Sequence, residues 1–302
     1  MLDVLMPVSK IDWSQEAIAS IAAASLFAKV KTRLIIVLTR SDIFLSLDNH
    51  SQNEFLEIIT VKSYGANYET ALTAGSEYLQ GQYVALMNDD DLCTEDRFKI
   101  QLSVLIDTNS DVCIGKMKKF GQLSKKLSFN NQLYFQYHHL FLLLGPYGAN
   151  ATWMMKRNWW ESKIGKLELA GEWDWAFALK YFPDATYHYC PETLYFYRQH
   201  KDQTSRKIGY RSNLASEMGA PIEEYWRKAI GEETSRDVIN ILAFPYIAEG
   251  VKLRKLREIT LIYIRFQRQF GFISFWFTYQ YVLRVILAFT PHYLASKLGM
   301  RR

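Results

Sequence analysis

The 302-residue chain has few of the features that mark secreted or repetitive proteins. Its three cysteines, Cys93, Cys113 and Cys190, lie far apart and without metal-ligand spacing. This pattern indicates free thiols in a reducing compartment and not a disulfide framework. The first residues enter an apolar segment without a charged leader, so we expect no secretory signal. Neither an internal repeat nor a low-complexity segment is present, which argues against a solenoid or a disordered chain.

The chain also lacks a long uninterrupted apolar run. Its best candidate, residues 272–289, contains three polar residues and Arg284, whereas a membrane-spanning helix needs about 20 predominantly apolar residues. Charge is uneven: residues 251–302 hold ten Lys or Arg and one acid, a net +9, and residues 1–250 carry a net −4. An acidic body with a basic, aromatic tail suggests that the tail meets an anionic surface.

The tail has the pattern of a helix at a membrane surface. In residues 251–270, apolar side chains share one helical stripe and basic side chains surround it, which is typical of interfacial helices. For residues 272–289 we favour an in-plane anchor, and a spanning or re-entrant helix and a buried helix stay open as alternatives. Because no nucleic-acid-binding motif accompanies the basic residues, we expect an anionic membrane surface as the partner of residues 251–302, and no nucleic acid.

The first two thirds of the chain alternate between strand and helix patterns. Strands are expected at residues 4–8, 33–38, 55–61, 83–87, 111–114, 149–155 and 186–197, and helices at 14–27, 67–79, 94–105, 158–163 and 172–181. Ser14 and Thr94 are the expected N-caps of two of these helices. Such alternation predicts βαβ units and a mostly parallel sheet. Residues 210–302 look wholly helical, so we predict an α/β domain at 1–206 and a helical extension at 207–302.

Three consecutive aspartates, Asp89, Asp90 and Asp91, follow the apolar run 83–87. A short apolar run of this kind fits a buried strand of a parallel sheet, and the carboxyl ends of such strands face the crevice where α/β proteins bind ligands. Adjacent carboxylates repel one another unless water or a cation neutralises them. Since Mg²⁺-type ions are held by carboxylates together with phosphate oxygens, the cluster points to a metal–diphosphate site. A solvated acidic turn is the plain alternative.

Six ordered motifs across residues 1–206 resemble a known family. They are Met6-Pro7-Val8, Tyr64-Gly65-Ala66-Asn67 with Glu69-Thr70-Ala71-Leu72, the 81–91 segment that ends in the aspartates, Gly148-Ala149-Asn150-Ala151-Thr152, Gly171-Glu172-Trp173-Asp174-Trp175, and Tyr197-Arg198-Gln199-His200. Each motif alone is weak, but their order resembles family 2 glycosyltransferases, inverting enzymes of the GT-A fold that build bacterial surface polysaccharides. The resemblance implies a Rossmann-like sheet flanked by helices and a sugar-transfer reaction.

The resemblance also implies how a metal and a donor would be held. It makes Asp90 the best ligand of a Mn²⁺ or Mg²⁺ ion, with Asp91 or Asp89 assisting and His200 as a further ligand or a donor to the β-phosphate. The residues expected near the nucleoside-diphosphate sugar are Pro7, Val8, Asp42, Asn67, Asn88, Asp89 and Arg198. Arg198 could neutralise the diphosphate or brace its loop.

Two positions depart from the family pattern. The acid usually found just after the second strand is missing, with Asp42 the nearest one, and Asn88 replaces the first acid of the Asp-x-Asp-Asp motif. The base of the nucleotide is therefore open, with UDP as the default because it is the commonest donor in the group.

A second carboxylate must accept the proton of the attacking hydroxyl. Glu172 is the preferred base by the resemblance, since flanking tryptophans can raise its pKa. Asp174 is the rival, although an acid there could instead support a helix N-terminus.

Taken together, the sequence predicts a metal-dependent inverting glycosyltransferase, cytoplasmic and peripheral on the inner face of the cell membrane, with a glycan or lipid-linked acceptor. One alternative is a catalytically inactive scaffold of a polysaccharide assembly complex, suggested by the two departures. Another is a nucleotidyltransferase, which the absence of a basic Gly-rich phosphate loop disfavours.

Overall fold

The structure is a computed structural model that describes residues 1–43, 53–121, 150–165, 173–201 and 203, together with short helical pieces between residues 222 and 286. The chain separates into two compact units. The first comprises Met1–Asn131, Gly148–Trp173 and Asp184–Gln203, and the second Gln132–Tyr147, Asp174–Pro183 and Thr204–Arg302. Residues 204–221 lie outside the described part of the chain, so a domain boundary at 206 stays a prediction.

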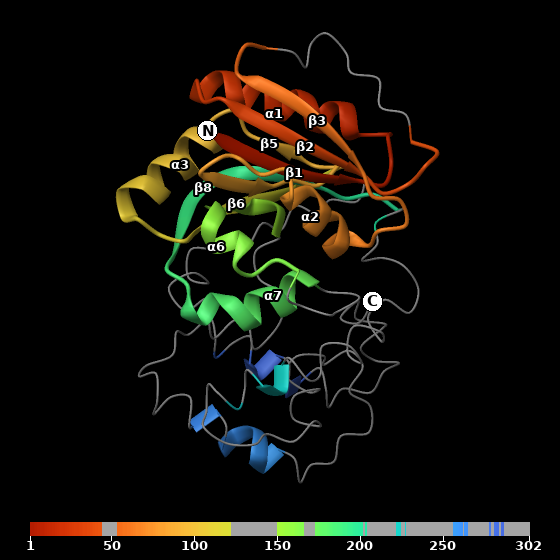
Figure 1. Cartoon of the computed structure of the whole chain (residues 1–302). Coiled ribbons are helices and arrows are strands. Elements are labelled where there is room, and N and C mark those ends of the chain that lie inside the picture. The colour runs from red at the N-terminus through yellow and green to blue at the C-terminus, as the bar shows by residue number, and fades with distance from the viewer. Residues whose placement is uncertain are drawn as a thin grey trace. The chain divides into compact units, whose positions relative to one another are not determined.

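The described residues of the first unit form one eight-stranded mixed sheet (Figure 1). Its spatial order is β3 (Leu56–Lys62), β2 (Thr32–Leu38), β1 (Leu2–Val8), β4 (Tyr83–Leu86), β7 (Trp153–Lys156), β6 (Val112–Phe120), β8 (Tyr187–Arg198) and β5 (Leu92–Cys93). The first four strands are parallel, β7 runs antiparallel to both neighbours, and β8 is parallel to β6. The predicted α/β fold is confirmed.

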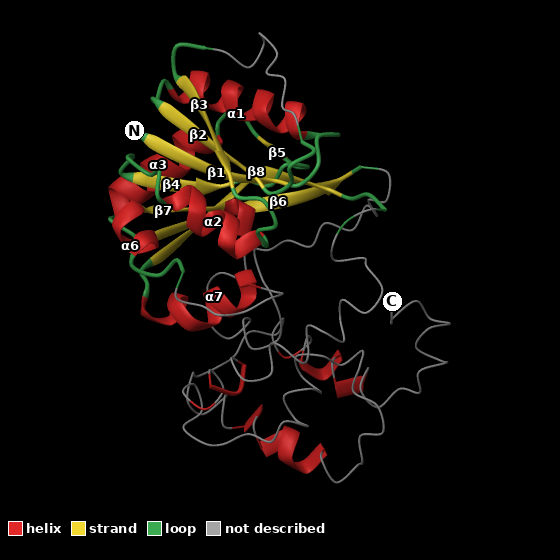
Figure 2. Ribbon diagram, turned by 45° about the vertical axis from the view of Figure 1, so that its right-hand side comes forward, coloured by secondary structure: helices red, strands yellow, loops and turns green. Residues whose placement is uncertain are grey.

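Helices lie on both faces of this sheet (Figure 2), and alternating side chains of the central strands pack against them. Leu2, Val4 and Met6 of β1 belong to the buried cluster that includes α1 (Ser14–Ala28) and α3 (Arg97–Thr108). Leu5 and Val37 face the other way, toward α2 (Tyr68–Ser76). A Cβ on Gly75 of α2 would lie 2.9 Å from both Leu5 Cδ2 and Val37 Cγ2, so this helix packs as closely as it does because residue 75 has no side chain.

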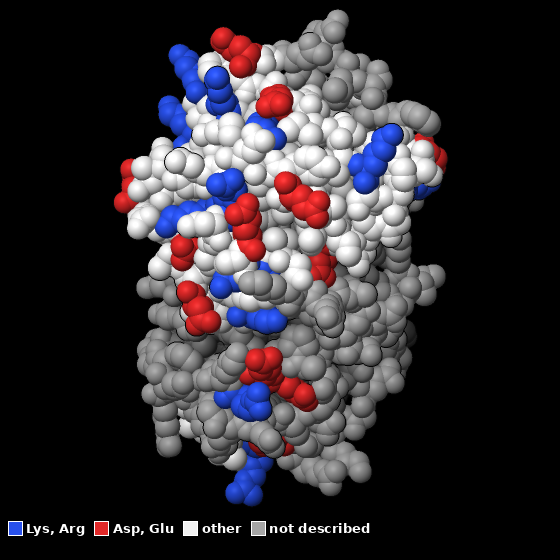
Figure 3. All heavy atoms as spheres, in the orientation of Figure 1, with Lys and Arg blue, Asp and Glu red and all other residues white. Residues whose placement is uncertain are grey.

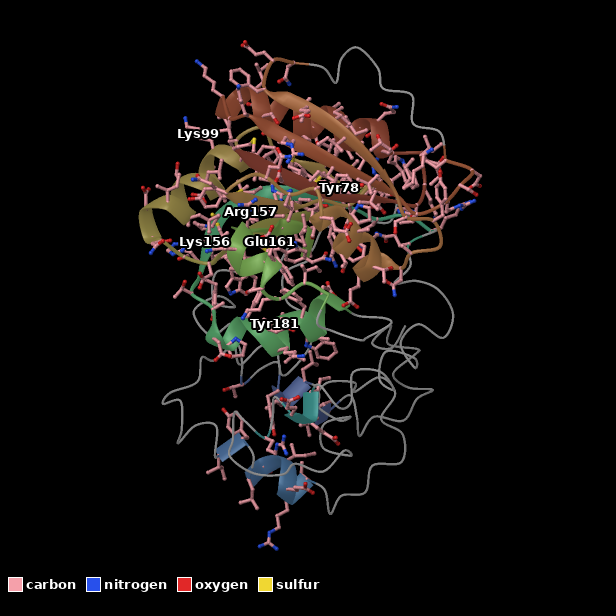
Figure 4. All side chains as sticks on the ribbon, viewed as in Figure 1. Tyr78, Lys99, Lys156, Arg157, Glu161 and Tyr181 are labelled. Atoms are coloured by element: carbon pink, nitrogen blue, oxygen red, sulfur yellow. The ribbon has the colours of Figure 1, made fainter. Side chains whose placement is uncertain are left out.

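Charged side chains make contacts between helices and within them. The ammonium group of Lys99 on α3 lies 5.5 Å from the ring centre of Phe27 on α1 (Figure 4). On α6 (Arg157–Glu161), Arg157 Nε lies 3.8 Å from Glu161 Oε1, one turn along the helix. Over the described surface shown in Figure 3, acidic and basic residues are interspersed.

The predicted elements correspond to observed ones, with corrections at their ends. Ser14 is the first residue of α1, not its cap, because its hydroxyl donates to Ile11 O and leaves the helix N–H groups alone. Asp96, not Thr94, occupies the N-cap position of α3, and Thr94 Oγ1 donates to the Asp96 carboxylate. The two-residue strand β5 was not predicted, since so short a segment carries no periodicity.

The second unit is helical wherever it is described. It contains α7 (Trp173–Tyr181) except for its first residue, and the first two residues of the short 3-10 helix η3 (Phe182–Asp184). Residues 256–261, 263–264 and 281–283 of this unit are also helical. Tyr281 Oη donates to Ile259 O at 2.6 Å, which joins two of these helical pieces. Most of residues 210–302 lies outside the described part, including the larger share of the proposed membrane helices. Among the described residues, none of the helices has the length and apolar character needed to cross a bilayer.

Candidate active site

The acidic loop, residues 88–91, begins where β4 ends and lies beside the end of β1. Parallel pairing sets Leu5 opposite Leu86. Met87 N donates to Leu5 O at 3.0 Å, so the hydrogen bonding with β1 continues one residue past the end of β4. Because the carboxyl ends of parallel strands meet at one edge of a sheet, the acidic loop and the residues after Val8 come together there.

Asp89 binds the backbone of the loop that follows β1. Its Oδ2 accepts hydrogen bonds from Ser9 N at 2.8 Å and from Lys10 N at 3.1 Å. Burial, and then the like charge of Asp90, raise the pKa of Asp89 to about 6, although the two backbone N–H groups oppose the shift. Asp89 therefore ties two loops together, and its expected contact with the donor stays a prediction.

Asp91 is fully buried and bonded on both oxygens. Oδ1 accepts from Arg198 N at 2.7 Å, and Oδ2 accepts from Tyr195 Oη at 2.8 Å and from Asn88 Nδ2 at 2.9 Å. Burial and the charge of Asp90 raise the pKa of Asp91 to about 7. These contacts suit a brace between the acidic loop and β8, and a metal-binding role for Asp91 stays a prediction.

Asp90 and His200 face each other across the two loops. Asp90 Oδ2 lies 3.0 Å from His200 Nε2, and 27% of the Asp90 side chain is exposed to solvent. The His200 ring packs on Trp13 with ring centres 4.3 Å apart. Its buried Nδ1 has no hydrogen-bond partner among the described residues. The structure thus brings together two of the residues that the resemblance names for the ion.

Arg198 holds the loops around Asp90 in place. Its Nε donates to Asp90 O at 2.8 Å, and its Nη2 donates to Glu16 Oε2 at 2.7 Å. The guanidinium lies 4.7 Å from the ring centre of Phe120 and 5.5 Å from that of Trp13. Of the two roles expected for Arg198, these contacts favour bracing over direct neutralisation of a diphosphate.

The other residues expected near the donor lie at the same edge or close to it. Pro7 and Val8 are the last two residues of β1, and Val8 O accepts from Thr39 Oγ1 at 3.0 Å. Asn67 caps α2, with Oδ1 accepting from Thr70 N at 2.8 Å. Asn88, besides its bond to Asp91, lies 3.4 Å from Tyr68 Oη.

Asp42 is occupied by its neighbour Arg40. The two exposed side chains form an ion pair with two hydrogen bonds, and the hydrogen bond from Arg40 lowers the pKa of Asp42. An acid is therefore present at this position, as the sequence suggested, but its charge is neutralised by the guanidinium of Arg40.

The two candidate bases are not placed relative to the acidic loop. Glu172 lies outside the described residues. Asp174 is in the first turn of α7, where its Oδ1 accepts from Trp175 N at 2.9 Å, and it belongs to the second unit. The choice between Glu172 and Asp174 stays a prediction.

Sequence reasoning missed the residues that support the site from behind. Tyr195 and Arg97 were not selected, because an aromatic residue in a strand and a basic residue in a helix are usually structural. Glu16 and Trp13 were missed for the same reason. The available signal in the sequence was that Trp13 and Glu16 follow β1 closely and that Tyr195 lies near the end of β8.

Comparison with known proteins assigns this arrangement. Residues 16–162 match the model of glycosyl transferase family 2. Residues 16–162 therefore form a glycosyltransferase family 2 segment of this chain. Its fold is the GT-A fold that the sequence resemblance predicted. No curated protein matches its sequence.

Solved glycosyltransferase structures resemble the whole chain in fold. Residues 1–349 of S. aureus TarS in complex with UDP-GlcNAc align with a TM-score of 0.60 at 15% identity, covering 99% of this chain and 92% of that one. The same TarS segment with UDP gives 0.53 at 14% identity, covering 99% and 91%. The mannosyltransferase PcManGT from Pyrobaculum calidifontis, in complex with GDP-Man and Mn²⁺, gives 0.52 at 12% identity, covering 99% and 86%.

Proposed function

We propose that this glycosyltransferase moves a sugar from a nucleoside-diphosphate sugar, UDP-linked by preference, to a hydroxyl of a lipid-linked or growing polysaccharide, with inversion at the anomeric carbon. The facing pair Asp90 and His200, 3.0 Å apart at the edge where β1 and β4 end, carries the proposal. Complexes of the similar folds with UDP-GlcNAc and with GDP-Man and Mn²⁺ support the class of donor and the use of a cation.

The chemistry of the pair fits a divalent ion. A carboxylate oxygen and an imidazole nitrogen that lie 3.0 Å apart could both serve as ligands of a divalent ion such as Mn²⁺. Within the described residues, no group of three or more His, Cys, Asp or Glu side chains could hold a metal. Asp90 and His200 would therefore share the ion with the oxygens of a bound diphosphate. We expect the ion to bind tightly only together with the nucleotide.

The ion would supply positive charge beside the departing diphosphate. The chain itself does the remaining work. Arg198 and Asp91 fix the loops that carry His200 and Asp90, so that both side chains are positioned before the donor arrives. The oxygen of the acceptor hydroxyl bonds to the anomeric carbon while the bond between that carbon and the phosphate oxygen breaks. A carboxylate, Glu172 by preference, accepts the proton that the hydroxyl loses.

The test compares binding and turnover in matched variants. Calorimetry with UDP and Mn²⁺ should show binding by the wild-type protein, and Asp90→Asn and His200→Gln should each weaken it at least tenfold. Glu172→Gln should keep that affinity but lower release of UDP from UDP-sugars by about 10²-fold or more. Asp174→Asn serves as the control. If Asp174→Asn loses turnover and Glu172→Gln does not, the two residues exchange roles.

A wild-type protein that binds no nucleotide in the presence of Mn²⁺ or Mg²⁺ would overturn the enzymatic proposal. It would favour the inactive scaffold suggested by Asn88 and by the missing acid after the second strand.

We further propose that residues 251–302 bring the enzyme to an anionic membrane surface on the cytoplasmic side, where a lipid-linked acceptor resides. The net charge of +9 supports this placement. So do the exposed side chains of Leu256, Leu261 and Ile264, which surround the equally exposed Arg257 on one helical segment.

A further inference from the structure

Helix α3 begins with a buried arginine just after the acidic loop. Arg97 is 1% exposed. Its Nη2 donates to Leu86 O at 3.1 Å and to Ala151 O at 2.8 Å, and its Nε donates to Gln101 Oε1 at 3.0 Å. One guanidinium nitrogen thus joins the end of β4 to the turn η2 (Asn150–Thr152).

Gln101, one helical turn later and fully buried, continues the same pattern. Its Nε2 donates to Thr152 O at 2.9 Å and to Cys113 O at 3.1 Å. Through its Oε1 bond to Arg97, the two side chains form one unit, which we call the α3 clamp. The clamp binds four backbone carbonyls that belong to β4, η2 and β6.

The sheet explains why side chains are needed at this place. The pairing of β4 with β7 ends at Ala85 and Met154, and that of β6 with β7 ends at Ile114 and Trp153. Leu86, Ala151 and Thr152 lie just past these last pairs, and buried carbonyls without donors would destabilise the fold. Side chains of α3 supply the donors.

The charge of Arg97 is an unusual choice for this purpose. Among the described residues no carboxylate lies within ion-pair distance of it, and burying an unpaired charge is costly. Besides the carbonyls, its guanidinium faces the ring of Tyr195 at 5.2 Å. The hydroxyl of that tyrosine donates to Asp91 Oδ2 at 2.8 Å. Arg97 therefore supports the acidic loop in two ways. It binds the carbonyl of Leu86 just before the loop, and it contacts the ring of Tyr195, whose hydroxyl binds Asp91.

We propose that Arg97 and Gln101 are positioning residues for sugar transfer, which fix the acidic loop relative to η2 by binding the carbonyls on both sides of the gap between them. The inference rests on the proposed function, in which the acidic loop holds the donor's diphosphate. The motif from Gly148 to Thr152, which contains η2, resembles the segment that lies below the acceptor site in the family. Because small misplacements of reacting groups lower turnover strongly, loss of the clamp should affect turnover more than donor affinity.

The experiment compares Arg97→Met, Arg97→Lys and Gln101→Met with Leu102→Ala, a buried α3 position outside the clamp. All variants are studied at a temperature where circular dichroism shows them folded. In Arg97→Met, turnover of a UDP-sugar at saturating donor should fall at least tenfold while the Kd of UDP with Mn²⁺ changes less than threefold. Arg97→Lys, which keeps one donor group, should recover part of the loss, and Gln101→Met should show a smaller loss than Arg97→Met.

Hydrogen exchange supplies a readout that does not depend on activity. Peptides covering residues 86–93 and 150–156 should exchange faster in Arg97→Met, whereas the β1 and β2 peptides should not, and Leu102→Ala should not reproduce this selectivity. Equal turnover losses in Leu102→Ala and Arg97→Met, or unchanged exchange at both segments, would overturn the clamp. If Arg97→Met does not fold, Arg97→Lys and Gln101→Met decide by the same criteria. A wild-type protein without nucleotide binding would refute the proposed function instead, and the exchange pattern would still test the clamp.

Discussion

At Asp89, two backbone N–H groups hold a carboxylate that burial and the neighbouring Asp90 both disfavour. The folded protein binds the proton of this carboxyl more tightly than the unfolded chain does, because its folded pKa of about 6 lies above the ordinary value of about 4. The protonated form therefore stabilises the fold at low pH, and that contribution is lost as the pH rises through 6.

Asp89→Asn should remove this dependence while its amide oxygen keeps both hydrogen bonds. In the absence of divalent ions we expect the variant to be more stable than the wild type at pH 8, by about 1–2 kcal/mol, and equally stable at pH 4. Denaturant unfolding at the two pH values measures the difference. Asp107→Asn on α3, which removes an exposed carboxylate, is the control and should change stability at neither pH. A variant less stable than the wild type at pH 8 would contradict the account.

Single residues also show what the sequence could reveal about the site. Asp90 and His200 are 110 positions apart, yet the resemblance paired them, and the structure places them in contact. Tyr195 and Arg97 could not be found in the same way. Their roles depend on which carboxylate or carbonyl lies opposite, and that is decided by strand order and not by local pattern.

At the scale of elements, α2 depends on its cap at Asn67, a residue that the sequence had placed near the donor and had not named as a cap. Asn67→Ala removes the bond from Thr70 N to Asn67 Oδ1 and should cost about 1 kcal/mol, a shift of roughly 2–4 °C in Tm. Asn67→Asp keeps an acceptor at the cap and should retain most of the stability. Thermal unfolding of the three proteins tests this, and equal Tm values for Asn67→Ala and the wild type would show that the cap contributes nothing.

Elements with a clear period were predictable and irregular ones were not. The strands β1 and β2 and the helix α1 follow from apolar runs and helical spacing. The extension of β6 to Phe120 passes through three lysines and one methionine, residues 116–119, and was not predicted. The parallel pairing of β6 with β8, with its register shifts at Lys116, involves residues about 75 positions apart, and no local signal specifies such a partner.

At the scale of the whole molecule, the basic tail predicts binding to anionic vesicles. The wild-type protein should float with phosphatidylglycerol-containing vesicles at low salt and dissociate as ionic strength rises. Leu261→Gln with Ile264→Gln should reduce flotation, since both side chains are exposed and their loss leaves the described contacts intact. Leu26→Gln, an exposed position on α1, is the matched control. Equal flotation of the Leu261/Ile264 variant and the wild type would contradict an apolar contact with lipid.

Strand β8 is made after every other strand, yet it lies inside the sheet, between β6 and β5. On the ribosome, more than a hundred further residues are therefore synthesised after the three aspartates before Tyr195 and Arg198, which bind Asp91, are available. Donor binding should accordingly arise late in synthesis and all at once, and nascent chains that stall before residue 187 should be captured by chaperones and not by nucleotide.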